Sequence, residues 1–415
     1  MKLNNDLKII YAIALFEAIV LILGPGPKFI DDCDTPSYID AWDSFTNGTI
    51  DLLRTPVYPA FLGLLKNILG QPLYMWIAIL IQHFIFFLSI GILYKLIRLF
   101  AGSSRIAFWI TLFYSSYPGF TFTNNWGLTQ SFALSGCVFI IYLTLLLCKQ
   151  PTIWRGGLFT FMLLFLLFLR PGLVYFLPVF FLSWVLYLFK NKRTGVIGLV
   201  GVVIAALTVF FYMKAFERQY GLFTFTGITV KNQFTIARDA GFFDSSSDLV
   251  RDYDKTYEEI YPKEHNWSMV DKVYYSKHKI TDVYDSINNA FRKDPIRWVA
   301  FCYDRLYRSA QEPLSGLCQI KYKEKKLDIV GPMVNTIYLF VFFYSILLIY
   351  WIIKRKMVPW LSLLLCMLII CNTITTIVGA PYGSYILPVT PFYLMLIAQV
   401  LSCMKFKPLK NIEMV

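Results

Sequence analysis

Residues 195–213 read GVIGLVGVVIAALTVFFYM and contain no charged side chain, and this stretch decides the fold class. An α-helix needs roughly 20 apolar residues to cross the hydrocarbon core of a bilayer. Similar runs recur along the 415-residue chain, in which 57% of the residues are hydrophobic and only 16% are charged. This composition excludes an ordinary soluble protein and predicts an all-α polytopic membrane protein.

On both sides of this stretch, long apolar runs bounded by charged residues, Pro or Gly mark ten candidate membrane-spanning helices. The fifth run is short, and an alternative is that it forms a hairpin with the sixth around Arg170-Pro171. The ten runs lie near residues 8–24, 72–94, 106–122, 128–148, 156–169, 172–189, 195–213, 332–353, 358–378 and 385–403.

Basic residues indicate which side of the membrane each connection occupies, because cytoplasmic loops carry an excess of Lys and Arg. On the side shared by both termini, sixteen basic residues stand against only Asp6 and Glu413. We therefore expect both termini to be cytoplasmic and the two long connections, 25–56 and about 216–330, to be extracytoplasmic. The sixteen are Lys2, Lys8, Lys95, Arg98, Arg105, Lys149, Arg155, Lys190, Lys192, Arg193, Lys354, Arg355, Lys356, Lys405, Lys407 and Lys410.

On this topology the chain divides into three parts. Residues 1–215 form an N-terminal membrane module that includes the first outer loop, 25–56, and residues 331–415 form a C-terminal membrane module. Residues 216–330 carry 18 Lys or Arg and 17 Asp or Glu, and their turn signals and helical periods predict a mostly helical cap. Because most of the net charge of +13 orients the protein in the membrane, it does not indicate nucleic acid as a partner.

One helix of the expected cap has a clear start, because Asp294 is followed by Pro295. Arg297, Arg305 and Arg308 then fall on one face of that helix. Such a face would suit a lipid phosphate. The alternative is an amphipathic helix at the membrane surface whose arginines are solvated or extend to the headgroups.

The first outer loop is acidic, with six Asp between residues 31 and 51 and Arg54 close behind. Thr35-Pro36 predicts the start of a short helix, so Asp34 lies at its entrance. A carboxylate fixed there is a candidate general base for a hydroxyl acceptor. The alternative is that these acids are solvated charges or a cation site.

The order of residues in this loop resembles a known group of enzymes. DTPSY at residues 34–38 and RTPVYP at 54–59 are similar to the first outer loop of polyprenyl-phosphate-sugar-dependent glycosyltransferases of the GT-C superfamily. This superfamily includes the dolichyl-phosphate-mannose protein mannosyltransferases and the aminoarabinose lipid A transferases. The resemblance implies that Asp34 is the catalytic carboxylate, that Arg54 contacts the donor phosphate, and that Tyr38 and Tyr58 line the pocket.

Three further segments carry the same resemblance. Residues 118–131 are similar to the turn between the third and fourth spans, although an acid often stands where this chain has Gln130. Leu169-Arg170-Pro171 resembles an Arg-Pro at the outer end of a middle span, and YGSYILPVTP at 382–391 resembles a C-terminal Arg-Tyr ending. In that ending Ser384 replaces the Arg, so the missing charge would come from Arg170 or from the Arg305 and Arg308 face. Gln130 and Tyr385 are expected pocket residues.

The implied activity is an inverting transfer of a sugar from a polyprenyl-phosphate donor to a hydroxyl of lipid A, another glycan or a protein. It would occur on the outer face of a bacterial inner membrane, among membrane lipids. Because a phosphate leaves without protonation, one base suffices. Asp32 would orient Asp34 or hold a divalent cation with it. We expect no cofactor and no required metal, since only three His accompany the acids.

Two other functions remain open at this point. An O-antigen ligase or polymerase also joins lipid-linked sugars, but relies on outer-face arginines rather than on an acidic first loop. A transporter or flippase of lipid-linked saccharides would be expected to show internal repeats and ionisable residues inside the bundle. The sequence offers only Glu17 as a clear mid-span acid and no obvious repeat.

Overall fold

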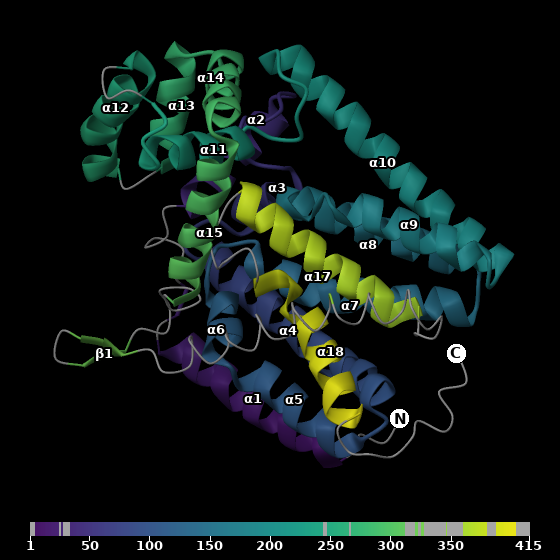
Figure 1. Ribbon diagram of the computed structural model, residues 1–415. Helices are drawn as coiled ribbons and strands as arrows, with labels where there is room; N and C mark the ends of the chain where they lie inside the picture. The colour runs from purple at the N-terminus through teal and green to yellow at the C-terminus, as the bar shows by residue number, and fades with distance from the viewer. Residues whose placement is uncertain are drawn as a thin grey trace.

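The structure is a computed structural model that describes residues 5–24, 26–27, 34–243, 247–264, 267–311, 320–322, 325–327, 346, 360–379 and 387–403. Most of these residues lie in helices (Figure 1). This agrees with the expected all-α fold class; two short strands, β1 (Ile320–Tyr322) and β2 (Lys325–Leu327), pair antiparallel.

Apolar helices of the first 220 residues pack together and, with the C-terminal helices, form the larger of the two hydrophobic cores among the described residues. Helix α4 continues past the predicted end near residue 94 and stops before Gly102, which adopts φ 61°. Arg170 leaves the helical region directly before Pro171, where the fifth run was expected to end. The helices are α1 (Asn5–Leu23), α4 (Leu73–Ala101), α5 (Ser104–Ser116), α6 (Pro118–Thr121), η1 (Phe122–Asn125), α7 (Gln130–Lys149), α8 (Ile153–Leu169), η2 (Pro171–Leu173), α9 (Phe176–Leu188) and α10 (Lys192–Tyr220).

The membrane-spanning capacity of the described residues agrees with an α-helical membrane protein. Four segments are long and apolar enough to cross a bilayer: Leu73–Ala101, Gln130–Lys149, Pro171–Leu188 and Lys192–Tyr220. Apart from residue 346, the expected span near 332–353 lies outside the described residues. The count of ten spans therefore stays a prediction.

Two shorter helices separate α1 from α4. Helix α2 (Thr35–Thr46) has Pro36 in its first turn, as the loop sequence predicts, and is followed by Gly48 at φ 75°. Helix α3 (Val57–Leu69) is apolar and was not expected, because its 13 residues are too few to cross a bilayer.

The cap is helical and has a core of its own. In Figure 1 helices α11 to α14 gather at one end of the molecule, α15 runs from them alongside the apolar helices, and α10 runs from the apolar helices up to them. Phe216 near the end of α10 belongs to the core of the cap, and so do Leu52 and Leu53 from the first outer loop. The cap helices are α11 (Ile228–Asp239), α12 (Asp248–Glu264), α13 (Trp267–Lys277), α14 (Ile280–Lys293) and α15 (Pro295–Gln311).

The C-terminal helices pack back onto the N-terminal ones. Helix α17 (Trp360–Gly379) contacts α9, where the Trp360 indole donates to the Ser183 carbonyl at 2.8 Å. The Tyr175 hydroxyl donates to Asn372 Oδ1 at 2.9 Å. The segment formed by η4 (Leu387–Val389) and α18 (Thr390–Cys403) contacts α4, α5 and α7.

Glycine allows α10 to approach α9 closely. A Cβ at Gly198 would lie 2.3 Å from the Trp184 indole, closer than any real contact. A Cβ at Gly157 on α8 would meet nothing within 4 Å.

We therefore expect Gly198→Ala to lower the free energy of unfolding by about 1–3 kcal/mol, the usual effect of overpacking. Gly157→Ala is the matched control, and it should be neutral or stabilising by up to about 1 kcal/mol because Ala favours helix. Thermal unfolding of both variants in one detergent would test this. Equal midpoints would contradict the close packing of α10 on the indole.

Candidate functional site

The structure brings Asp34 and Arg54 into direct contact between the apolar helices and the cap. Arg54 Nη2 donates to Asp34 Oδ1 at 2.6 Å, and Arg54 Nε donates to Ser37 Oγ at 2.7 Å. The guanidinium also lies 4.3 Å from the centroid of the Tyr38 ring and donates to its hydroxyl at 3.2 Å. The Arg54 side chain is 13% exposed and that of Asp34 is 45% exposed. The pair is therefore anchored on its Arg side and open to solvent on its carboxylate side.

The electrostatic surroundings keep both groups charged. Burial on its own would raise the pKa of Asp34, but the positive charges of Arg54, Lys231 and Arg170 and the hydrogen bond from Arg54 hold that pKa below its usual value. Burial would lower the pKa of Arg54, yet the surrounding acidic groups raise it. At neutral pH Asp34 is thus a carboxylate that can accept a proton.

Helix α2 explains why the Asp34 side chain is available to Arg54. Asp34 is the residue that precedes the helix, but its carboxylate makes no capping bond to the helix backbone. Its carbonyl oxygen instead accepts from the Ser37 backbone at 3.1 Å and from Ser37 Oγ at 2.6 Å. The same turn thereby positions Asp34 and Ser37, two of the three residues that contact the guanidinium.

A buried polar network supports the aromatic side of the site. Tyr38 is 7% exposed and packs edge-on against Tyr58 with ring centroids 4.9 Å apart. Tyr58 is wholly buried, and its hydroxyl donates to Gln82 Oε1 at 2.8 Å. Gln82 in turn donates to the carbonyls of Asn124 and Trp126 at 2.7 and 3.0 Å. Tyr58, itself fixed by Gln82, therefore supports the position of the Tyr38 ring.

The turn between α6 and α7 closes this network. Ser131 Oγ donates to Asn124 Oδ1 at 2.5 Å, and Thr35 Oγ1 donates to the Gly127 carbonyl at 3.2 Å. Gln130 begins α7, and its buried Oε1 has no hydrogen-bond partner in the part of the chain that the structure describes. The turn thus lies against the start of α2, next to Asp34.

Two cap residues that the sequence analysis did not single out lie beside the pair. Lys231 Nζ on α11 is 2.6 Å from Asp271 Oδ2 on α13, and Asp271 is wholly buried. Burial raises the pKa of Asp271, although Lys231 and Arg54 oppose this with their positive charges. Lys231 also acts on the pKa of Asp34, so the cap supplies a cation to the site.

The remaining expected residues are placed as follows. Arg170 is 8% exposed at the break between α8 and η2, and its charge reaches Asp34. Arg305 and Arg308 lie on α15, but their side chains are outside the described part of the structure. Asp32 and Tyr385 also lie outside the described residues.

Two further findings concern a metal site and the basic face of α15. Among the described side chains, no three His, Cys, Asp or Glu converge as a metal site would require. Arg297 donates to the Ala240 carbonyl at 2.8 Å and lies 5.1 Å from the centroid of the Phe242 ring. These contacts attach the start of α15 to the residues that follow α11.

Comparisons with known proteins add little beyond this geometry. No protein family and no curated protein matches the chain. The structure is similar to the archaeal oligosaccharyltransferase AglB from Archaeoglobus fulgidus, solved in complex with an inhibitory peptide and a dolichol-phosphate, with a TM-score of 0.49 and 11% sequence identity. The match covers 95% of this chain and 50% of that one, so the chain spans about half the length of that enzyme. A likeness of this size transfers neither activity nor ligands.

We expect Arg54→Gln to raise the pKa of Asp34, because it removes both a charge and a hydrogen bond. Lys231→Gln should raise it less, and Lys277→Gln, an exposed control on α13, should leave it unchanged. A ¹³C NMR titration of labelled Asp carboxyls, with Asp34 assigned through Asp34→Asn, would measure these values.

The sign of the accompanying stability change follows from the lowered pKa. The ionised Asp34 stabilises the fold above the pKa of an unfolded Asp, about 3.9, and this stabilisation disappears as pH falls through the lowered value. An Asp34 pKa that is the same in the wild type and in Arg54→Gln would contradict the assigned electrostatics.

Proposed function

We propose that this protein is a membrane glycosyltransferase of the GT-C type that transfers a sugar, with inversion, from a polyprenyl phosphate to a hydroxyl. The observation that carries the proposal is the ion pair between Asp34 and Arg54 at the junction of the apolar helices and the cap. A base for the acceptor and a cation for a phosphate are the two groups that such a transfer requires.

The donor end of the reaction needs positive charge. As the bond between the anomeric carbon and the phosphate oxygen breaks, the phosphate leaves with the bonding electrons and its negative charge grows. Arg54 would meet that charge, with Arg170 and the cap residue Lys231 contributing at longer range. A guanidinium suits a phosphate better than an ammonium, because two of its N–H groups can contact two oxygens.

The acceptor end needs a base. Asp34 would take the proton of the acceptor hydroxyl while its oxygen attacks the anomeric carbon from the face opposite the phosphate. The 45% exposure of the Asp34 side chain leaves room for that approach. When the donor phosphate shares the guanidinium, Asp34 loses part of its stabilisation and becomes a stronger base. Donor binding would thus prepare the carboxylate for the acceptor.

The remaining parts of the proposal follow the membrane character of the chain. The site would lie on the extracytoplasmic face of a bacterial inner membrane, with both termini cytoplasmic. The acceptor would be a lipid, a glycan or a protein. The proposed chemistry needs no cofactor. In an alternative mechanism Asp34 and Asp32 would hold a divalent cation, and a chelator would then abolish the activity.

The decisive variant is Asp34→Asn, which keeps the size of the side chain and removes the base. We expect transfer of labelled sugar from polyprenyl phosphate in membranes to fall at least about 100-fold, the usual contribution of general-base catalysis. Asp43→Asn changes an exposed acid on the same helix and should keep wild-type activity.

The two alternative functions give different results in this assay. Full activity of Asp34→Asn would refute the proposal. Transfer only from diphosphate-linked oligosaccharides would favour a ligase, and movement of an intact lipid-linked sugar without transfer would favour a flippase.

A further inference from the structure

The segment directly before Arg54 has no regular structure, yet its backbone is firmly held. Residues 50–54 lie in neither helix nor strand. The Ile50 backbone exchanges two hydrogen bonds with the Gln219 side chain, at 2.9 and 3.0 Å, and its carbonyl accepts from the Tyr220 hydroxyl at 2.6 Å. The end of α10 therefore fixes the first part of this segment.

The start of the cap fixes the second part. The Gly227 backbone donates to the Leu52 carbonyl at 2.7 Å, and Thr226 Oγ1 donates to the Leu53 carbonyl at 2.8 Å. A Cβ at Gly227 would lie 2.8 Å from the Leu52 oxygen, so a residue without a side chain permits this approach. Both Leu side chains are buried in the core of the cap.

Asp51 connects this segment to Arg54. Its side chain is 3% exposed, and its Oδ1 accepts from the backbone N–H groups of Leu53 and Arg54 at 2.9 and 2.8 Å. Such a carboxylate acts as a local template for the two residues that follow it. It therefore determines the direction in which the chain presents Arg54.

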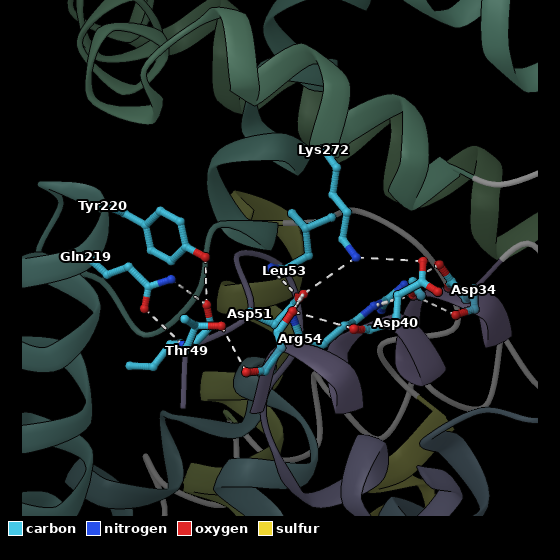
Figure 2. Close-up of polar contacts among 12 residues, drawn as sticks. Asp34, Asp40, Thr49, Asp51, Leu53, Arg54, Gln219, Tyr220 and Lys272 are labelled. Carbon is cyan, nitrogen blue, oxygen red and sulfur yellow. Dashed lines mark hydrogen bonds and ion pairs between the residues drawn. The ribbon is translucent and has the colours of Figure 1, made fainter. Parts of the chain in front are cut away.

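The second oxygen of Asp51 contacts the elements on either side. Ser44 Oγ on α2 lies 3.5 Å from Oδ2, and Lys272 Nζ on α13 lies 3.9 Å from it. Lys272 also lies 3.7 Å from Asp40 Oδ2 (Figure 2). These longer contacts are weaker than the two backbone hydrogen bonds. The position of the Asp51 carboxylate therefore contributes more than its charge to holding the Arg54 backbone.

We propose that Asp51 is a positioning residue that sets Arg54 for the donor phosphate. Arg54 bears a long, flexible side chain, and from this backbone position its guanidinium contacts Ser37, Tyr38 and Asp34 together. Asp51 provides that fixed point and joins it to the cap. The catalytic consequence rests on the proposed transferase function, whereas the backbone contact does not.

Two conservative variants separate location from charge. Asp51→Asn keeps an oxygen at the same place and loses the charge, while Asp51→Glu keeps the charge and moves the carboxylate by one methylene. Asp43→Glu, on the exposed side of α2, is the matched control. Each variant is measured for hydrogen exchange of the peptide that covers residues 50–55 and for the KM values of donor and acceptor.

We expect Asp51→Glu to speed exchange at Leu53 and Arg54 and to raise the donor KM about tenfold, the effect of one lost hydrogen bond. The acceptor KM should stay within about twofold, and a general loss of structure would not spare it in this way. Asp51→Asn should retain slow exchange and a donor KM close to that of the wild type.

Four results would overturn the proposal. They are a tenfold higher donor KM in Asp51→Asn, wild-type exchange in Asp51→Glu, a wild-type donor KM in Asp51→Glu, and an equal rise of both KM values in Asp51→Glu. If Asp51→Glu does not fold, the donor KM and exchange of Asp51→Asn alone decide, since the proposal requires both to be retained. If the wild type transfers no sugar, the proposed function fails, and the exchange measurement still reports whether Asp51 holds Arg54.

Discussion

The arrangement around the site depends on one constraint: a guanidinium that is almost withdrawn from water must keep its partners. Removing the partner of a buried charge costs several kcal/mol, whereas an ion pair with an exposed carboxylate contributes little by itself. Arg54 is 13% exposed and Asp34 is 45% exposed. The contacts that stabilise Arg54 are therefore those with Ser37 and Tyr38 as much as the ion pair. Asp34 is the more exposed member of the ion pair.

Three separate parts of the chain keep Arg54 and its partners in place. The network of Tyr58, Gln82 and the turn after α6 supports the Tyr38 ring on which the guanidinium lies. The end of α10 and the start of the cap hold the backbone before Arg54. The pair formed by Lys231 and Asp271 places a second cation near Asp34 while its own charge is compensated. Both the apolar helices and the helices α11 and α13 thus contribute to the surroundings of the Arg54–Asp34 pair.

Much of the local structure could be predicted from the sequence, because it depends on neighbouring residues. Pro36 and Arg170-Pro171 set helix ends where expected, and the order of motifs in the first loop singled out Asp34 and Arg54, which form an ion pair in the structure. The ion pair between Lys231 and Asp271 could not be predicted from the sequence, because the two residues are 40 positions apart in a segment with nearly balanced charge. Helix α3 was missed because it is apolar yet too short to span a bilayer.

The contacts of the first loop with the cap have a consequence for biosynthesis. The bonds of Ile50 and Leu53 reach residues 169 to 173 positions further along the chain. A ribosome must therefore deliver seven apolar runs and the first residues of the cap before the backbone of Arg54 can be fixed. Contacts across such separations form late, because loop closure must precede them. A nascent chain that ends before about residue 230 would already hold Asp34 and Arg54 without having assembled the site.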